Sequence, residues 1–394
     1  MIVGFLDGCN RQALSPLTSY LGRMNINDVI RKDLLAIADT VHGGQAWKLE
    51  GVEDFSHNLN PFGPPECLKE LVAKAISGVD HYPDDNSSEL KGTLAEHFGI
   101  GQDNIVIGAG SSDIIRMFPN TFLGKWDRAL VMRPSFAEYS HQCKVAGASV
   151  KELLLREDND LRIDADELLA AANGVKAVYI CNPNNPTGRI EPRAKILRIV
   201  KELGEENTLV FLDETLLELV PSHGEVSCVK EVEKYDNLVV IGSLTKSFAI
   251  PGIRVGFGFA SESVIRAMNK VRMTWNVGHI EQCVASCLIR KHMGHVAKAA
   301  DMMRREAVRM YRGLNDIGFK VDMTDSFFFF NSLKSIGMSV PEFKLKMLSE
   351  KIMVRDCGSF GPEFKDHIRF CVKDGKRNDM FVAAVKKATE GRVK

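Results

Sequence analysis

The sequence has no excess of charge of either sign and no long hydrophobic run. Its 394 residues include 51 Lys plus Arg and 51 Asp plus Glu, so the formal net charge is zero. Without a long basic run, neither nucleic acid nor a membrane surface is expected as a partner. No segment approaches the ~18 apolar residues of a membrane span, and the start, Met-Ile-Val-Gly-Phe-Leu-Asp, lacks the basic residues of a signal peptide. These absences favour a cytoplasmic protein.

Metal-binding and disulfide spacings are also missing. The nine cysteines are scattered, which favours reduced thiols. Cys283 and Cys287 are four residues apart, but no second Cys/His pair lies near them, so we expect no metal site. There is no internal repeat and no low-complexity linker.

What is present is a pattern of short apolar strands separated by amphipathic segments such as Ala194–Leu203. This alternation predicts an α/β fold with a mainly parallel sheet covered by helices on both faces. The expected strands are Ile105–Ile107, Ala129–Met132, Ala177–Ile180, Leu209–Leu212, Leu238–Ile241 and Val255–Phe259.

The pattern changes at about residue 280, which predicts a second, smaller α+β domain. It contains an expected helix over His295–Ile317, a Phe327–Phe330 strand buried on both faces, a helix near Val340–Lys351, and short strands around Val354 and Phe370. We therefore expect a large domain over 71–280 and a small domain over 281–394. Residues 41–70 would form an arm over the site. Residues 1–40 would form an extension of unknown role with one helix, Ile26–Ala38.

A lysine directly follows the apolar strand Leu238–Ser243, in the segment Ser243-Leu-Thr-Lys246, and Arg254 lies eight residues beyond it. The strand end gives the lysine a rigid support, while Ser243 and Arg254 can both contact an anion. This is what a covalent imine link to pyridoxal 5'-phosphate (PLP) requires. A lone S-x-x-K is more often a surface lysine after a turn.

Two further motifs occur in the right order. The strand from Ala177 to Cys181 stops at Asn-Pro-Asn-Asn185-Pro-Thr-Gly188, a turn that presents rigid amides at a strand end. The strand from Leu209 ends in Asp213-Glu214, and a carboxylate at the tip of a buried strand indicates a cationic partner.

With these motifs, the chain resembles the fold-type I PLP enzymes over residues 41–394, in the branch that contains histidinol-phosphate aminotransferase and threonine-phosphate decarboxylase. The resemblance implies that Lys246 carries PLP, that Asp213 pairs with the pyridine nitrogen and that Asn185 binds the ring's phenolic oxygen. Phe136, in Arg133-Pro-Ser-Phe136, matches the aromatic residue that stacks on the ring. Tyr82 matches a tyrosine that reaches the neighbouring subunit's phosphate, so a homodimer is implied.

The cofactor phosphate would be held by Ser243 and Arg254, with help from Ser111 and Ser112. These two serines follow a glycine-containing loop, Gly108-Ala-Gly110, at the start of a helical pattern. A helix N-terminus offers free N–H groups to a phosphate.

Substrate binding is also implied by the resemblance. Arg369 matches the arginine that pairs with the substrate α-carboxylate, and Arg355 matches the one that contacts a substrate phosphate. The segment Val41-His42-Gly43-Gly44, followed by Asp54 to Gly63 with Asn60, resembles the entrance of threonine-phosphate decarboxylase. Asn185 would also contact the substrate. A small phosphorylated amino acid is therefore the expected ligand.

Leu216 favours the decarboxylase, because the aminotransferases usually have a tyrosine at that position. The implied reaction is decarboxylation of L-threonine O-3-phosphate to (R)-1-aminopropan-2-yl phosphate for cobalamin biosynthesis. Histidinol-phosphate aminotransferase remains the first alternative. A ligand-sensing regulator on the same fold is the second, although the first forty residues are few for a DNA-binding domain.

Overall fold

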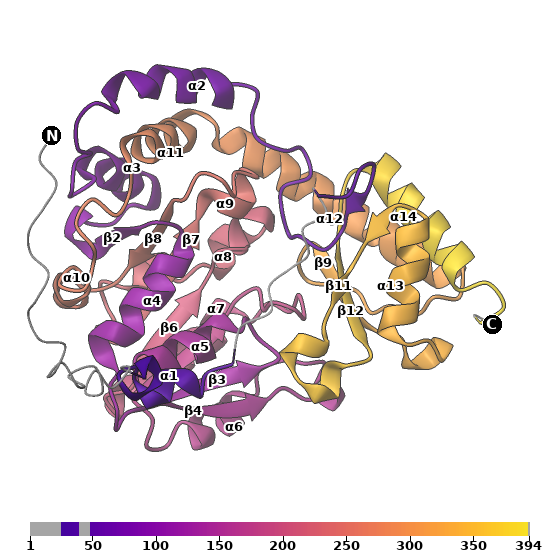
Figure 1. Ribbon diagram of the computed structural model, residues 1–394, viewed down its shortest axis with the longest axis horizontal. Helices are drawn as coiled ribbons and strands as arrows, with labels where there is room; N and C mark the ends of the chain where they lie inside the picture. The colour runs from indigo at the N-terminus through magenta and orange to yellow at the C-terminus, as the bar shows by residue number, and fades with distance from the viewer. Residues whose placement is uncertain (1–24, 39–47, 393–394) are drawn as a thin grey trace, which may run out of the picture. The chain divides into compact units, whose positions relative to one another are not determined.

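The computed structural model describes residues 25–38 and 48–392 (Figure 1). The chain divides into two units, with the boundary between Ala38 and Asp39. In the first unit, the prediction of one helix over Ile26–Ala38 is wrong. The structure has a 3-10 turn, η2 (Ile26–Asp28), and one helical turn, α1 (Lys32–Leu35), separated by a non-helical Arg31. Neither element contains a buried residue, so nothing here stabilises a longer helix by packing.

The main sheet of the second unit has the mainly parallel form that the sequence predicts. Strands β7, β6, β5, β3 and β4 are parallel neighbours, whereas β8 is antiparallel to both β7 and β2. In spatial order the strands are β2 (Ile105–Gly108), β8 (Gly256–Phe259), β7 (Leu238–Ser243), β6 (Leu209–Asp213), β5 (Ala177–Cys181), β3 (Arg128–Arg133) and β4 (Ser149–Leu154).

Both faces of this sheet are buried. Successive side chains of a strand point to opposite faces, and here both sets of side chains pack into apolar clusters. On β5, Val178 and Ile180 belong to one apolar cluster, whereas Tyr179 and Cys181 belong to the other. Figure 1 shows helices on both sides of the strands. The helices of this region are α2 (Leu68–Ala75), α3 (Ser88–Phe98), α4 (Ser111–Phe122), α5 (Glu138–Val145), α6 (Ala165–Ala171), α7 (Arg193–Glu205), α8 (His223–Val226), α9 (Leu244–Ser247), α10 (Glu262–Met268) and α11 (His279–Lys291).

The C-terminal part is built around a three-stranded antiparallel sheet in the order β11-β12-β9, which confirms the predicted α+β pattern. Phe328 and Phe329 are both buried although they point to opposite faces of β9, as expected. The domain limits at 41, 71 and 281 stay predictions. The elements are α12 (Met293–Asp316), β9 (Phe328–Ser332), α13 (Val340–Ser349), β10 (Ile352–Met353), β11 (Arg355–Asp356), β12 (His367–Cys371) and α14 (Gly375–Ala388).

The segment around β1 (Glu53–Asp54) connects the two sheets. β1 pairs in parallel with β10, and the Cys371 N–H at the end of β12 donates to the Phe55 carbonyl. A few residues later, the Asn60 N–H donates to the Lys246 carbonyl beside the main sheet, at 3.0 Å. One short stretch of chain is therefore bonded to both sheets.

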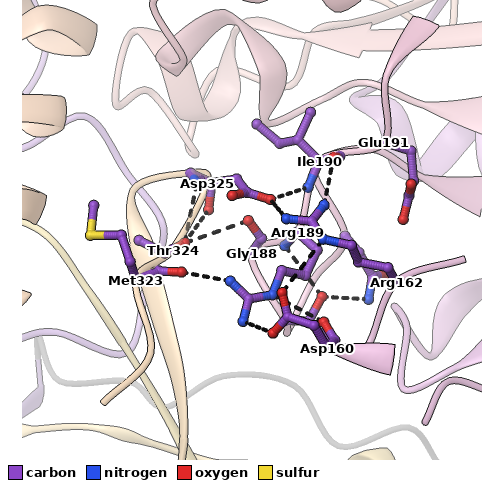
Figure 2. A network of polar contacts seen from close by, with 12 residues as sticks. Asp160, Arg162, Gly188, Arg189, Ile190, Glu191, Met323, Thr324 and Asp325 are labelled. Carbon is purple, nitrogen blue, oxygen red and sulfur yellow. Dashed lines mark hydrogen bonds and ion pairs between the residues drawn. The ribbon is translucent and has the colours of Figure 1, made fainter. Parts of the chain in front are cut away.

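A polar network fixes the turn after β5 against residues 323–326 (Figure 2). The Arg189 guanidinium donates to the Met323 carbonyl at 2.6 Å and pairs with Asp160. Asp325 accepts from the Ile190 N–H at 3.1 Å and from Arg162 at 2.6 Å. The turn that carries Asn185 is thus held by the chain that leads into β9.

Gly188 lies at the closest point of this contact. Its φ is +73°, and a Cβ there would stand 2.6 Å from Thr324 Oγ1 and 2.8 Å from the Phe328 carbonyl oxygen. Because the Phe328 atom belongs to the backbone, it cannot move aside cheaply.

We expect Gly188→Ala to destabilise the protein by about 2 kcal/mol more than Gly174→Ala, because overpacking adds to the cost of the positive φ. Gly174 is the matched control, since its φ is +71° and a Cβ added there would meet nothing within 4 Å. Urea unfolding of both variants measures the difference. Equal losses of unfolding free energy in the two variants would show that the close contact at Gly188 adds nothing to the cost of the substitution.

Candidate active site

The predicted motifs meet at one edge of the main sheet, where β5, β6 and β7 end. Open α/β sheets place ligands at this edge. Because β8 is antiparallel, its beginning lies at the same edge, which brings Arg254 to the site just before Gly256. A cavity of about 330 Å³ opens here, and its lining includes Asn185, Asp213 and Lys246.

Lys246 lies on α9, whose first turn is capped by Ser243. The Ser243 hydroxyl accepts from the Thr245 N–H at 3.2 Å. Burial lowers the pKa of Lys246 to about 8; the charges of Arg369 and Arg254 add to this effect, and Asp213 opposes it. The amine is therefore neutral, and able to act as a nucleophile, at a much lower pH than an ordinary lysine.

Asp213 is buried at the end of β6, and both of its oxygens have partners. The Tyr139 hydroxyl donates to Oδ2 at 2.6 Å, and the Thr215 N–H donates to Oδ1 at 2.9 Å. Burial raises the pKa of Asp213, while these hydrogen bonds and the charge of Lys246 oppose the rise. Tyr139 was not identified from the sequence, although it lies three residues after Phe136.

The expected phosphate site is compact. Arg254 donates to the Ser112 hydroxyl at 3.2 Å, and its guanidinium lies over Gly110, where a Cβ would stand 2.3 Å from Nη2. Gly110 is the N-cap residue of α4. Because glycine has no side chain, it offers no acceptor to the free N–H groups of the first helical turn, so no cap side chain competes with an anion for them. Ser111, Ser112, Ser243 and Arg254 all line the cavity, which is the set expected for a phosphate.

The opposite end of the cavity carries two arginines on adjacent strands, with Arg355 and Arg369 as register partners. Arg369 donates to Asn185 Oδ1 and to the Ser56 carbonyl, while its buried Nε has no partner among the described residues. Arg355 donates to the Ser359 hydroxyl at 2.9 Å. Both arginines line the cavity and present positive charge to a ligand.

Several sequence predictions need separate comment. Phe136 and Leu216 line the cavity. Asn60 is not in the described lining: its side chain donates to the Ser247 carbonyl at 2.8 Å, and so supports the backbone beside Lys246. Instead, the lining contains Asn58, whose buried Oδ1 has no partner in the described structure. Two asparagines spaced by one residue could not be distinguished from sequence alone.

Tyr82 lies away from this cavity. Its side chain is 74% exposed and stacks on Trp275 with the ring centroids 4.1 Å apart. His42, Gly43 and Gly44 fall outside the described residues, so their predicted role stays a prediction. In residues 25–38 and 48–392 no helix has the length and apolarity to cross a membrane, and no group of three or more His, Cys, Asp or Glu could hold a metal ion.

The lining residues fit PLP. A buried lysine with a lowered pKa, a carboxylate with remaining acceptor capacity and an arginine–serine phosphate site share one cavity with an aromatic side chain. These features define the site of a PLP-dependent enzyme.

Comparison with known proteins agrees: the chain belongs to the class I and II aminotransferase family, whose model matches residues 50–385. Its cofactor is pyridoxal 5'-phosphate.

The chain is 30% identical over 329 residues to a provisionally named threonine-phosphate decarboxylase of Caldanaerobacter subterraneus, covering 84% of this chain and 88% of that protein. It is 27% identical over 363 residues to a histidinol-phosphate aminotransferase of Ruminiclostridium cellulolyticum, covering 91% and 97%. The crystal structure of the histidinol-phosphate aminotransferase from Clostridium acetobutylicum superposes with a TM-score of 0.79 at 28% identity, covering 85% and 98%.

We expect borohydride reduction of the purified protein to attach the cofactor to Lys246, because its buried amine is poised to be neutral near pH 8. Peptide mass mapping identifies the labelled lysine. Lys246→Ala should keep the fold by circular dichroism and lose the label. A label on another lysine would contradict this assignment.

We expect Tyr139→Phe to keep the cofactor and to lower kcat by about 10-fold or more, the effect of losing one hydrogen bond to a charged group. The ionised form of Asp213 would lose a donor while burial still opposes its charge. Tyr179→Phe is the matched control, since Tyr179 is equally buried and stacks on Tyr139, but its hydroxyl contacts Cys143. Similar kcat losses in both variants would count against a role through Asp213.

Proposed function

We propose that this chain decarboxylates L-threonine O-3-phosphate to (R)-1-aminopropan-2-yl phosphate, a reaction of cobalamin biosynthesis. The observation that carries the proposal is Leu216. It lines the cavity close to Asp213, at a position where the resemblance to the aminotransferases calls for a tyrosine. Leucine offers no hydroxyl to the cofactor's phenolic oxygen, which leaves Asn185 as the expected partner for that atom.

The two arginines support a substrate with two anionic groups. We assign Arg369 to the α-carboxylate, because a planar guanidinium binds a carboxylate through two parallel hydrogen bonds. We assign Arg355 to the substrate phosphate, with Ser359 beside it. The arrangement therefore suits a phosphorylated amino acid.

When bound, PLP supplies an electron sink for the bond broken at the substrate's α-carbon. The chain's own groups prepare that step. Asp213, as a carboxylate, would keep a proton on the pyridine nitrogen. Lys246, released when substrate binds, lies in the same cavity and would deliver a proton to the α-carbon after CO₂ leaves. The way in which the chain holds the substrate carboxylate would then select which bond at the α-carbon breaks.

Histidinol-phosphate aminotransferase is the second candidate. The similarity to the Ruminiclostridium and Clostridium proteins favours it, since the matches cover nearly their full lengths. That reaction would use Arg369 for the carboxylate of an amino-acid partner substrate and Arg355 for the phosphate of histidinol phosphate. A homodimer in which Tyr82 reaches the neighbouring site is proposed for either function; the exposure of Tyr82 supports it.

One assay with two readouts separates the candidates. We expect CO₂ from L-threonine O-3-phosphate alone, at a rate that 2-oxoglutarate does not change, because a decarboxylase needs no amino-group acceptor. We expect negligible glutamate from histidinol phosphate plus 2-oxoglutarate. Glutamate formation at roughly 1 s⁻¹ or faster, without CO₂ from phosphothreonine, would promote the aminotransferase.

A further inference from the structure

His57 lines the cavity but has no assigned role. It follows β1 in the segment that connects the two sheets. Its Nδ1 lies 2.5 Å from Asp54 Oδ2, and the other oxygen of Asp54 accepts from the Ser56 N–H at 2.7 Å and the Ser56 hydroxyl at 2.6 Å. The carboxylate therefore fixes both the local turn and the orientation of the imidazole ring.

This pairing determines which nitrogen can serve a ligand. Burial would raise the pKa of Asp54, but the hydrogen bonds from His57 and Ser56 outweigh it and lower the pKa. An ionised Asp54 only accepts, so Nδ1 must carry a proton. Nε2 is then the ring nitrogen left for a ligand in the cavity, and it donates when the ring is protonated.

The backbone places His57 next to the carboxylate end of the site. The Ser56 carbonyl, one residue earlier, accepts from Arg369, and the charge of Asp54 also acts on the Arg369 guanidinium. Arg369 is in turn held by Asn185. The His57 ring therefore lies on the segment that directly supports Arg369.

We propose that the imidazolium form of His57, oriented by Asp54, is a specificity-determining group that donates Nε2–H to the carboxylate held by Arg369. This role of His57 depends on the proposed function only in the identity of the ligand that carries the carboxylate. An arginine guanidinium binds a carboxylate through hydrogen bonds that lie in the plane of the guanidinium. A second donor from another direction would fix where the carboxylate lies, and with it the torsion about the bond between the α-carbon and the amino nitrogen, which would decide which bond at the α-carbon breaks.

The test compares ligands with and without a carboxylate on the holoenzyme, by following the cofactor's visible absorption immediately after rapid mixing, before the substrate is turned over. L-Threonine O-3-phosphate carries both anionic groups, whereas 1-aminopropan-2-yl phosphate lacks the carboxylate. We expect His57→Gln to weaken binding of the first by about 10-fold, the scale for one hydrogen bond to a charged group, and binding of the second by less than about 2-fold. Equal weakening of both ligands, or no change in either, would overturn the proposal.

Two further variants sharpen the result. Asp54→Asn should weaken only the carboxylate-bearing ligand, and by less, because Asp54 acts through His57. His81→Gln is the matched control: His81 also pairs with a carboxylate, at 2.6 Å from Asp80, but does not line the cavity. It should leave both affinities unchanged. A loss for His81→Gln equal to that for His57→Gln would also overturn the proposal.

The same comparison remains informative if the decarboxylase proposal fails. L-Glutamate carries a carboxylate and histidinol phosphate does not, so His57→Gln should weaken only glutamate binding in an aminotransferase. CO₂ release reports on the proposed reaction independently. Selective loss of carboxylate-bearing ligands without CO₂ release would retain the role of His57 and reject the decarboxylase.

Discussion

The gathering of like charges around one cavity is the constraint on which the site depends. Among the described lining residues, Lys246, Arg254, Arg355 and Arg369 carry positive charge, and Asp213 is the carboxylate. Their mutual repulsion, together with burial, explains the lowered pKa of Lys246. A dianionic cofactor phosphate and an anionic substrate would compensate this excess. The architecture holds the cations together before these ligands arrive, which is the preorganisation that binding and catalysis require.

The preorganisation depends on contacts between segments far apart in the sequence. Arg369 on β12 is held by Asn185, from the turn after β5, and by the Ser56 carbonyl, from the segment after β1. The turn after β5 is itself fixed by Arg189 and Asp325. Movement of either sheet relative to the other would therefore displace the guanidinium. The geometry at the carboxylate is a property of the whole second unit.

The sequence predicted well those features that depend on local pattern and on strand ends. Apolar runs located six of the seven strands of the main sheet, but not the edge strand β4, whose side chains are mostly exposed. The residues at or just after the ends of three predicted strands, Asn185, Asp213 and Lys246, meet in the cavity because parallel strands end at one edge. It could not predict Tyr139 as the partner of Asp213, because their contact joins α5 to β6 across 74 residues. For a related reason, the sequence could not show which of Asn58 and Asn60 lines the cavity. Asn60 is held by hydrogen bonds to the carbonyls of Lys246 and Ser247, distant contacts that no local pattern reveals.

The same difference between strand ends and inter-sheet contacts bears on the choice between decarboxylation and transamination. The cofactor contacts lie on strand ends of the main sheet, and their chemistry is common to decarboxylation and transamination. If Arg369 binds the substrate carboxylate as we propose, the choice between the two reactions depends on a guanidinium that is held by β12, the Asn185 turn and the segment after β1. Under the proposed function, a single additional donor near Arg369 would bias which bond at the α-carbon breaks. Motifs at strand ends therefore point to the cofactor, while the proposed choice of reaction rests on the inter-sheet contacts around Arg369.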